Sequence, residues 1–464
     1  MSDVLWTADE IAAATGGQVI GGDFAVSGVS IDTRSIEVGD LFVALVGARD
    51  GNEFIGQALT NGARASLASV SDAPAPAVVV QDTFKALEAL GVAARERAPQ
   101  CKRGAVTGSV GKTSVTRAVE AGLRLAGKAH ASVKSYNNHI GVPLTLARMP
   151  RDTQRAVFEI GMNHADEITP LSGLVKPHAV AITTVGPVHI ENFPDGEAGV
   201  ARAKAEIFAG LQSGGIAVLN ADNRWFDFLK GEAEKVGATV WSFGEVAGAT
   251  ARLTGFAVEG EGATVSVDLR GEALSFPIRQ TGVHWGPNSL CVLLMLEALD
   301  VPRETALAAL AAFAPIEGRG AEKTVRIDGG AFTLVDESYN ANPVSMQAAL
   351  KTLGARKVAG RRIVALTDML ELGEDSPRFH AELAGPIAAA NVDMVFLAGV
   401  HMKSLWEQLP PTRRGGYAVV TEKLTAELAG AIRPGDVVMV KGSNGSKAGL
   451  LAQALAALDL GERV

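Results

Sequence analysis

Short apolar runs alternate with longer amphipathic segments through the middle of the chain. Residues 104–106, 156–160, 179–183 and 215–219 are such runs, and each is followed by a helix-like spacing of apolar positions. Strands of a parallel sheet are buried on both faces and read as continuous apolar runs, and helices usually connect them. This part of the chain therefore predicts an α/β fold, with a largely parallel sheet and helices on both faces.

The last third of the chain repeats this alternation more regularly. Strands are predicted at 332–335, 362–366, 394–398 and 437–440, with helical patterns between them. This is a Rossmann-like arrangement, in which ligands usually bind beyond the carboxyl ends of the strands. The chain has no G-x-G-x-x-G turn, so a dinucleotide site is not indicated.

Two polar segments divide the pattern. Residues 96–103 precede the central alternation, and residues 315–320 have the composition of a linker. The expected domains are residues 1–100, 101–314 and 315–464. The first domain carries short mixed elements, including the alternating run 39–45. Residues 250–280 are rich in strand formers and punctuated by Gly, and we expect them to form an additional small sheet.

Composition narrows the function classes. A formal net charge of −8 argues against a dedicated nucleic-acid binder. No apolar run approaches the roughly 18 residues that a transmembrane helix needs, so no membrane insertion is expected. The chain begins without a basic and apolar leader, and its 2 cysteines, Cys101 and Cys291, show no metal-ligand spacing. These features favour a cytoplasmic protein.

Residues 106–114 read Val-Thr-Gly-Ser-Val-Gly-Lys-Thr-Ser, between a predicted strand and a predicted helix. Gly108 and Gly111 permit a tight turn, whose backbone N–H groups and helix N-terminus can hold a phosphate. Lys112 adds a cation, and the Thr113 hydroxyl is placed to bind Mg²⁺. The common G-x-x-x-x-G-K-[ST] spacing would need Gly in place of Val106, whereas the shorter T-G-x-x-G-K-T form fits fully. The segment predicts a nucleoside triphosphate site.

Polar residues follow two of the central strands. Glu159 ends the apolar run 156–160, where a buried carboxylate needs a cation or a hydrogen-bonding partner. Mg²⁺ is one such partner, and an ion pair with a nearby Lys or Arg is the alternative. His189 follows the next strand, and Lys204 lies on an amphipathic helix. Taken alone, His189 reads as a structural residue and Lys204 as a solvated one.

Together these motifs resemble the Mur ligase family over essentially the whole length of the chain. The first domain carries the segments 29–34 and 39–45. The centre carries the short phosphate loop, Tyr136-Asn137-Asn138, Glu159, His189 and Lys204. The last domain carries 336–346, 368–373 and 441–443. Within the family, the 336–346 segment is similar to that of the ligases that add D-alanyl-D-alanine. The members that add a single diamino acid have a Tyr-Ala-His-Thr-Pro type of sequence there.

The resemblance implies a reaction and its substrates. ATP phosphorylates the terminal carboxylate of UDP-N-acetylmuramoyl-tripeptide, and the amine of D-Ala-D-Ala attacks the acyl phosphate, which releases phosphate after ADP. The setting implied is cytoplasmic peptidoglycan precursor synthesis by a monomer that binds small molecules and no nucleic acid. By the same resemblance, residues 1–100 bind the UDP-sugar, 101–314 bind ATP, and 315–464 bind the incoming dipeptide.

The resemblance also implies residue roles. The ATP-binding set is Gly108, Ser109, Val110, Gly111, Lys112, Thr113, Ser114, His284, Asn288, Arg319 and Asp336. Within that set, Arg319 approaches the γ-phosphate and Asp336 the ribose. Thr113 and Glu159 hold one Mg²⁺, and His189 with a carbamylated Lys204 holds a second. The implied catalytic set is Lys112, Lys204, His189 and Arg319. The adenine-side pattern Gly-x-His-Asn-x-x-Asn is broken at Trp285, while His284 and Asn288 match it.

The implied substrate-binding set spans all three domains. It comprises Ser30, Arg34, Asn137, Asn138, Tyr339, Asn340 and Asn342. Simpler roles stay open for several of these positions. Asp32 beside them can cap its own turn, and the Asn-rich segment before Pro343 favours a turn regardless of function. Arg319 can be a linker residue with surface contacts.

Two other functions remain open from the sequence. One is the related ligase that adds a single diamino acid or lysine, which differs only in the last-domain signature. The other is a P-loop ATPase acting as a switch, with 334–337 as its Walker B strand and Glu337 orienting water. Two features argue against a switch ATPase. Val106 stands where the common phosphate-loop pattern has Gly, and Glu337 is more than 200 residues from Lys112. A GTPase is not indicated, because no Asn-Lys-x-Asp motif occurs.

Overall fold

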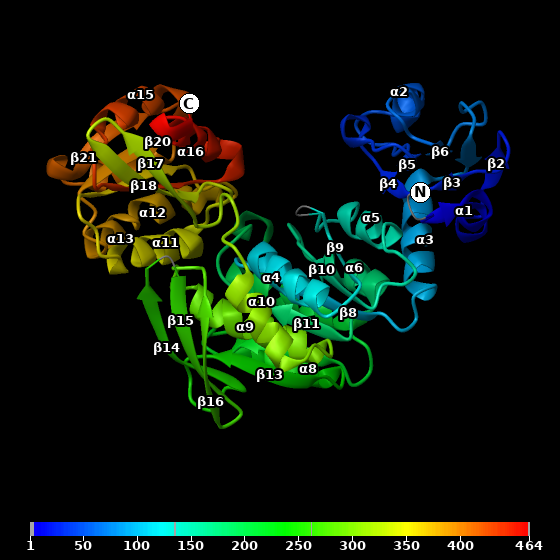
Figure 1. The fold of residues 1–464 in the computed structure, drawn as a ribbon, viewed down its shortest axis with the longest axis horizontal. Coiled ribbons are helices and arrows are strands. Elements are labelled where there is room, and N and C mark those ends of the chain that lie inside the picture. The colour runs from blue at the N-terminus through cyan, green and yellow to red at the C-terminus, as the bar shows by residue number, and fades with distance from the viewer. Residues whose placement is uncertain (1–3, 134–135, 261, 463–464) are drawn as a thin grey trace.

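The structure is a computed structural model that describes residues 4–133, 136–260 and 262–462. It is built around three main sheets of five, nine and six strands, which follow one another along the chain. In Figure 1 the nine-stranded sheet lies below, the N-terminal part stands above it on the right, and the C-terminal part stands above it on the left. Among the described residues, no helix has the length and apolar character to cross a bilayer.

The N-terminal sheet has the order β2-β7-β6-β5-β4, with β2 antiparallel to β7 and the other pairs parallel. Its strands are β2 (Gln18–Ile20), β4 (Gly28–Ser30), β5 (Asp40–Val43), β6 (Ala65–Ala68) and β7 (Ala77–Val79), beside a small pair β1 (Trp6–Thr7) and β3 (Ala25–Val26). All four residues of β5 are buried. Helix α2 (Ile55–Thr60) covers one face, while α1 (Ala8–Thr15) and α3 (Thr83–Glu96) cover the other.

Helix α3 joins this domain to the centre. Asp82 caps its first turn by accepting hydrogen bonds from the N–H groups of Phe84 and Lys85. Gly91 on α3 allows a close approach to α5 (Gly141–Ala147), because a Cβ there would lie only 3.1 Å from Leu146. The Trp6 indole donates to the carbonyl of Ala147 at 2.8 Å. The N-terminal and central domains therefore share one continuous apolar core.

The central sheet contains six parallel strands in the order β9-β10-β8-β11-β12-β13. They are β8 (Lys102–Thr107), β9 (Ala129–Ala131), β10 (Arg155–Glu159), β11 (Ala179–Ile182), β12 (Ile216–Asn220) and β13 (Thr239–Gly244). One face packs on α4 (Lys112–Leu125), α9 (Trp285–Ala298) and α10 (Arg303–Ala312). The other packs on α5, α6 (Ile168–Val175), α7 (Glu197–Ala205) and α8 (Phe226–Lys235). The predicted parallel sheet with two covered faces is confirmed.

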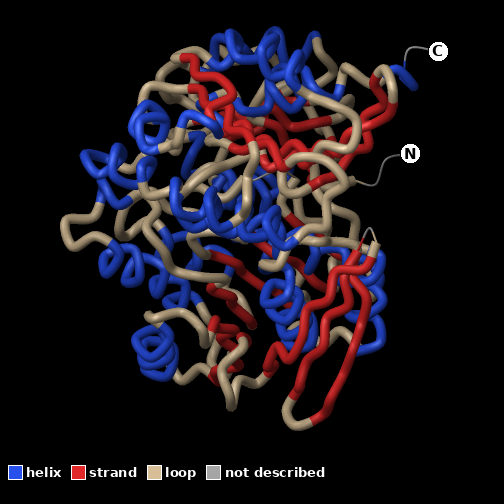
Figure 2. The backbone as a smooth tube through the Cα atoms, turned by 90° about the vertical axis from the view of Figure 1, so that its left-hand side faces the viewer, coloured by secondary structure: helices blue, strands red, loops and turns tan. Residues whose placement is uncertain are grey.

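The prediction of a separate small sheet at 250–280 is wrong. Strands β14 (Ala251–Glu259), β15 (Gly262–Leu269) and β16 (Glu272–Ile278) form an antiparallel ribbon, seen as the long strands at lower right in Figure 2. Phe243 of β13 pairs with Ala251 of β14, which joins the ribbon to the central sheet. Alternate residues of β15 are buried and belong to the same core as α9, so the ribbon extends the sheet to cover that helix.

The C-terminal sheet has the order β17-β18-β22-β19-β20-β21, and all pairs except β17–β18 are parallel. The four predicted strands are confirmed as β18 (Gly330–Glu337), β19 (Arg362–Thr367), β20 (Met394–Ala398) and β22 (Val437–Lys441). The edge strands β17 (Ala321–Ile327) and β21 (Arg414–Ala418) were not predicted, because edge strands are partly exposed and lack an apolar run. One face carries α11 (Pro343–Ala355), α12 (Ser376–Ala381), α13 (Ala384–Ala389) and α14 (Met402–Gln408). The other carries α15 (Thr421–Ala431) and α16 (Ala448–Ala456).

Candidate active site

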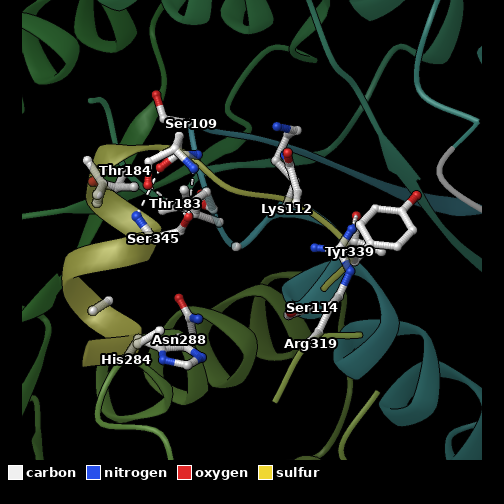
Figure 3. A pocket seen from close by; sticks show the side chains of 18 of the residues that line it. Ser109, Lys112, Ser114, Thr183, Thr184, His284, Asn288, Arg319, Tyr339 and Ser345 are labelled. Atoms are coloured by element: carbon white, nitrogen blue, oxygen red, sulfur yellow. Dashed lines mark hydrogen bonds between the residues drawn. The ribbon is translucent and has the colours of Figure 1, made fainter. Parts of the chain in front are cut away.

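A cavity of about 490 Å³ lies where the central and C-terminal domains meet (Figure 3). The central domain contributes the phosphate loop, the ends of β10, β11 and β12, and the start of α9. The C-terminal domain contributes the linker, the end of β18, the start of α11 and the end of β22. The lining residues with functional groups are Ser109, Lys112, Thr113, Ser114, Asn137, Glu159, Thr183, Thr184, Asn220, His284, Asn288, Arg319, Glu337, Tyr339, Asn340, Asn342, Ser345 and Lys441.

The phosphate loop joins β8 to α4, as the sequence predicts. Gly108 and Gly111 have φ values of 148° and 85°, and a Cβ at Gly108 would lie 1.9 Å from the Thr183 hydroxyl. Only Gly fits such a position. The Ser109 N–H donates to the carbonyl of Thr184 at 2.8 Å, so the loop is held against the end of β11. The loop backbone is thereby fixed around the N-terminus of α4, where a phosphate can bind.

Lys112 starts α4 and turns back over the loop. Its Nζ donates to the carbonyl oxygen of Gly108 at 2.7 Å. Burial lowers the pKa of Lys112, and the charge of Glu159 opposes that effect. The amine and the carboxylate therefore lie close enough to interact on one side of the cavity.

Glu159 ends β10 and is 2% exposed. Its Oε1 accepts a hydrogen bond from the side-chain amide of Asn137 at 2.7 Å. In the described part of the chain, no Lys or Arg lies within ion-pair distance of Glu159, although Lys112 is close enough to feel its charge. A buried carboxylate beside a phosphate loop is suited to a hard cation.

His189 and Lys204 lie outside the cavity wall but near the phosphate loop, since the charge of Lys112 lowers the pKa of both. Lys204 on α7 is 2% exposed, so the reading of a solvated Lys is wrong. Burial lowers its pKa well below the ordinary value, with Lys112 adding to the effect. Within the described residues its Nζ has no hydrogen-bond or ion-pair partner. A buried amine in this state favours its neutral form.

Arg319 reaches the phosphate loop from the linker. Its Nη2 donates to Oγ1 of Thr113 at 3.0 Å, and its guanidinium lies 4.1 Å from the centre of the Tyr339 ring. Figure 3 shows Arg319 and Tyr339 side by side, with His284 and Asn288 in another part of the cavity. The simpler role as a surface linker residue is wrong. The guanidinium is stacked and hydrogen-bonded in the cavity.

The segment after β18 forms the C-terminal wall. Asn342 caps α11 by accepting a hydrogen bond from the N–H of Ser345 at 2.9 Å, and Asn340 accepts from the N–H of Ala341 at the same distance. The expected turn chemistry is therefore present, although both side chains also line the cavity. Asp336 does not line it. Its carboxylate accepts from the N–H groups of Gly318 and Ser338, at 3.2 and 3.0 Å, and so fixes the linker turn that carries Arg319.

Glu337 and the buried Lys441 form an ion pair in the same wall. Lys441 Nζ lies 3.3 Å from Glu337 Oε2 and donates to the carbonyl of Asn340 at 3.0 Å. Strand β18 belongs to the C-terminal sheet, whereas the phosphate loop follows β8 of the central sheet. A Walker B strand lies in the same sheet as its phosphate loop, so that reading of 334–337 is wrong.

Family models match two segments of the chain. Residues 106–296 match the Mur ligase middle domain, and residues 323–444 match the Mur ligase, glutamate ligase domain. The UDP-N-acetylmuramoyl-tripeptide–D-alanyl-D-alanine ligase of Rickettsia prowazekii is 31% identical, over 96% of this chain and 98% of its own. The ligase of the same name from Escherichia coli is 33% identical over 85% of this chain and 86% of its own. The chain belongs to the Mur ligase family.

Solved structures agree that this chain is a Mur ligase. MurF from Acinetobacter baumannii matches with a TM-score of 0.85 and 27% identity, over 97% of this chain and 99% of that chain. MurF from Thermotoga maritima in complex with ADP has a TM-score of 0.77 over 94% of this chain and 98% of that chain, at 21% identity, and supports the fold alone. The predicted three-domain α/β fold is confirmed.

The residues of this Mur ligase fit a cation that arrives with a nucleotide. Glu159 and Thr113 both line the cavity, beside Lys112. No cluster of three or more His, Cys, Asp or Glu suited to a metal occurs in the part of the chain that the structure describes. Mg²⁺ is commonly held by one or two carboxylates together with phosphate oxygens and water. One carboxylate and one hydroxyl next to a phosphate loop match that requirement.

The remaining predicted residues of this Mur ligase lie elsewhere. Ser30 is buried at the end of β4, and its hydroxyl donates to the carbonyl of Asp32 at 3.3 Å. Asp32 accepts from the N–H of Arg34 at 3.0 Å and pairs with its guanidinium at 2.7 Å, so the expected local capping is confirmed. Asn138 accepts from the N–H of Gly141 at 2.9 Å at the start of α5. None of these residues lines the cavity.

Several cavity residues were not predicted as site residues. Thr183, Thr184 and Asn220 are the polar residues at or just after the ends of β11 and β12. Their signal is the one that identified Glu159, a polar residue directly after a buried strand. Lys441 ends β22 in the same way. Trp285, which breaks the family pattern, is buried against Phe313 at a ring distance of 5.7 Å and does not line the cavity.

Proposed function

We propose that this Mur ligase uses ATP to join D-alanyl-D-alanine to UDP-N-acetylmuramoyl-tripeptide, with release of ADP and phosphate. The names of full-length relatives support this reaction. The structural observation that supports this reaction most directly is one cavity lined by two segments. One is the phosphate loop, and the other is 339–345, which belongs to the segment that is similar to the ligases that add D-alanyl-D-alanine. In this proposal the nucleotide and the dipeptide bind in that one cavity.

The phosphate loop holds the β- and γ-phosphates in this proposal. Backbone N–H groups of 109–114 and the Lys112 amine neutralise their charge. Arg319 would approach the γ-phosphate from its position beside Thr113. Thr113 and Glu159 would hold Mg²⁺, which would supply charge stabilisation for the transferring phosphoryl group. His284 and Asn288 would face the base side of the nucleotide. Asp336 lies behind the cavity wall and would act on the ribose side by holding the linker turn.

The chemistry proceeds through an acyl phosphate. A carboxylate is a poor acyl donor, and phosphorylation supplies a leaving group that the dipeptide amine can displace. The protein contributes mainly orientation and charge stabilisation. Tyr339, Asn340 and Asn342 shape the dipeptide side, at the wall formed by the start of α11. Exclusion of water is required there, because water would hydrolyse the acyl phosphate.

His189 and Lys204 would hold a second Mg²⁺ near the acyl phosphate. Lys204 suits this role only in a modified form, because an ammonium group repels a cation. The neutral amine favoured by its burial can attack CO₂, lose a proton and become a carbamate anion. That anion is an oxygen ligand of the kind that Mg²⁺ prefers.

The N-terminal domain would bind the UDP-sugar part of the substrate. Ser30 and Arg34 lie at the end of β4 and in the next turn, and Asn137 and Asn138 lie on the central domain. In this proposal residues 1–100, 101–314 and 315–464 bind the UDP-sugar, ATP and the dipeptide respectively. The enzyme acts as a monomer in the cytoplasm, on small-molecule substrates.

Stoichiometry tests the proposed reaction. Purified protein with Mg²⁺, ATP, UDP-N-acetylmuramoyl-tripeptide and D-Ala-D-Ala should form pentapeptide product, ADP and phosphate in equal amounts. Omission of UDP-N-acetylmuramoyl-tripeptide or of D-Ala-D-Ala should prevent steady ADP release. Continuous ATP hydrolysis without UDP-N-acetylmuramoyl-tripeptide would indicate an ATPase and overturn the proposal.

A further inference from the structure

The carboxyl end of β22 lies between the ends of β18 and β19, because β22 is inserted between these two strands in the C-terminal sheet. Helix α11 follows β18 on one face of the sheet, and α16 follows β22 on the other face (Figure 1). In open α/β sheets, ligands bind where neighbouring strands send their connections to opposite faces. The part of the cavity lined by residues 339–345 lies at this point of the sheet.

Two side chains from the end of β22 hold consecutive carbonyl groups of the cavity wall. Lys441 donates to the carbonyl of Asn340 at 3.0 Å, and the Ser443 hydroxyl donates to the carbonyl of Ala341 at 3.3 Å. Gly442 separates the two, and a Cβ there would lie 1.6 Å from a side-chain oxygen of β19. Only Gly therefore lets the chain run this close to β19, and the end of β22 fixes the backbone of the wall.

The Ser443 hydroxyl also joins the wall to the loop after β19. Its oxygen accepts a hydrogen bond from the N–H of Leu370 at 3.0 Å, while its proton is donated to Ala341. A hydroxyl has one donor and two acceptor lone pairs, so its donor is fully used. Ser443 is buried and does not line the cavity. Any influence of Ser443 on a ligand must therefore act through the wall.

Ala341 stands between the two Asn residues that line the cavity. The Asn340 side chain accepts a hydrogen bond from the N–H of Ala341 at 2.9 Å. Asn342 follows directly and caps α11. Ala341 thus holds one Asn side chain through its N–H and is itself held by Ser443 through its carbonyl. A shift of this backbone would move both side-chain amides.

We propose that Ser443 is a positioning residue for the dipeptide acceptor, because it holds Ala341 and so keeps the amide groups of Asn340 and Asn342 in place. The proposal rests on the proposed function, in which these two Asn residues shape the dipeptide side. Without the hydroxyl, the carbonyl of Ala341 and the N–H of Leu370 would each lose a partner, and the wall would relax. A binding site that must be ordered by its ligand binds that ligand more weakly.

The test compares Ser443→Ala with Ser446→Ala as the matched control. Ser446 lies in the same loop, and its hydroxyl contacts Thr367 and the carbonyl of Ser443 but, among the described residues, none of the wall. The first measurement is amide hydrogen exchange of the protein without substrates. Ser443→Ala should exchange faster than wild type in peptides that cover 339–342 and Leu370, and Ser446→Ala should not. This result does not depend on the ligase reaction.

The second measurement compares KM for D-Ala-D-Ala with KM for ATP. Ser443→Ala should raise KM for the dipeptide about 5- to 30-fold, the cost of one or two lost buried hydrogen bonds, and should change KM for ATP by less than about 2-fold. A residue that only supports the fold would affect both constants. Ser446→Ala should match wild type in both.

Unchanged exchange in Ser443→Ala, an equal rise of the two KM values, or an equal effect of Ser446→Ala would overturn the proposal. A wild-type protein that forms no product from D-Ala-D-Ala would overturn the proposed function, and with it the dipeptide as the ligand of this wall. The exchange measurement would then still decide whether Ser443 holds the wall in place.

Discussion

Arg319 donates a hydrogen bond to the Thr113 hydroxyl at 3.0 Å, although 206 positions separate the two residues. Thr113 belongs to the phosphate loop of the central domain, and Arg319 belongs to the linker that leads into the C-terminal domain. The contact places the Arg319 guanidinium at the N-terminus of α4, against the phosphate loop. Asp336 fixes the turn that carries Arg319 through the N–H of Gly318. The linker is therefore part of the site.

Replacement of Arg319 should impair catalysis far more than folding. Arg319→Ala removes a charge aimed at the γ-phosphate, and we expect kcat to fall by about 10²- to 10³-fold. Arg319→Lys keeps the charge but not the flat guanidinium that stacks on Tyr339, so it should recover only part of the loss. Steady-state kinetics and thermal melting measure the two effects. Activity of Arg319→Ala equal to that of a variant of the exposed Arg279 would contradict this role.

Lys112 offers the simplest test of the phosphate loop. Lys112→Ala should remove most activity, by about 10²-fold or more, because the amine neutralises phosphate charge during transfer. The fold should persist, since the one hydrogen bond of the amine within the described residues is to the loop carbonyl of Gly108. Product formation and circular dichroism report the two outcomes. Lys85→Ala on the exposed side of α3 is the control, and near-normal turnover of Lys112→Ala would discard the loop assignment.

Replacement of Lys204 tests whether its side chain acts as a carbamate. Lys204→Ala should lose activity while binding of the UDP-substrate changes less, because only an oxygen ligand of the second Mg²⁺ is lost. Added short carboxylates should restore part of the turnover by supplying that ligand. Lys230→Ala, on the partly exposed surface of α8, should behave as wild type. Full activity of Lys204→Ala in CO₂-depleted buffer would mean that the buried amine has no role in the reaction.

Because His130 is buried, we predict that the protein loses stability at acidic pH. Burial lowers the pKa of His130 to about 4, from 6.5, and its Nε2 lies 2.7 Å from the carbonyl of Thr145. The native state thus keeps the ring neutral while the unfolded state takes up a proton below pH 6.5. The contribution of His130 to the free energy of unfolding is fully present above pH 6.5. It decreases as the pH drops toward 4, by at most about 3 kcal/mol.

Urea unfolding between pH 7.5 and pH 4.5 measures this dependence. His130→Gln should show a shallower fall in the free energy of unfolding than wild type. The exposed His164 is the control, and His164→Gln should keep the wild-type slope. Equal slopes in wild type and His130→Gln would contradict the assignment.

The sequence predicts the parts of this enzyme that follow local rules. Buried parallel strands such as β8, β10 and β20 are continuous apolar runs, and Gly108, Gly111 and Lys112 define the loop at the point where β8 ends. Glu159 was predicted for the same reason, as a polar residue at the end of a buried strand. Thr183 follows that rule too, and was missed because a Thr is common in any strand.

Other features depend on contacts that the sequence does not contain. The burial of Lys204 is set by packing around α7, and an amphipathic pattern alone favours a solvated Lys there. The β14–β16 ribbon joins the central sheet through one short pairing with β13, which periodicity cannot reveal. His189 Nδ1 lies 2.6 Å from Glu371 Oε2, and this contact requires the relative placement of two domains. Trp285 departs from a family pattern, and its ring packs into the core instead of lining the cavity.

The most direct test of the central claim is acceptor choice. Purified protein, ATP and Mg²⁺ are incubated with UDP-N-acetylmuramoyl-tripeptide and D-Ala-D-Ala, or with UDP-N-acetylmuramoyl-dipeptide and single diamino acids or lysine, and the products are identified by mass spectrometry. We predict UDP-N-acetylmuramoyl-pentapeptide from the first mixture and no product from the second. Addition of a single amino acid to the dipeptide substrate, without use of D-Ala-D-Ala, would contradict the account.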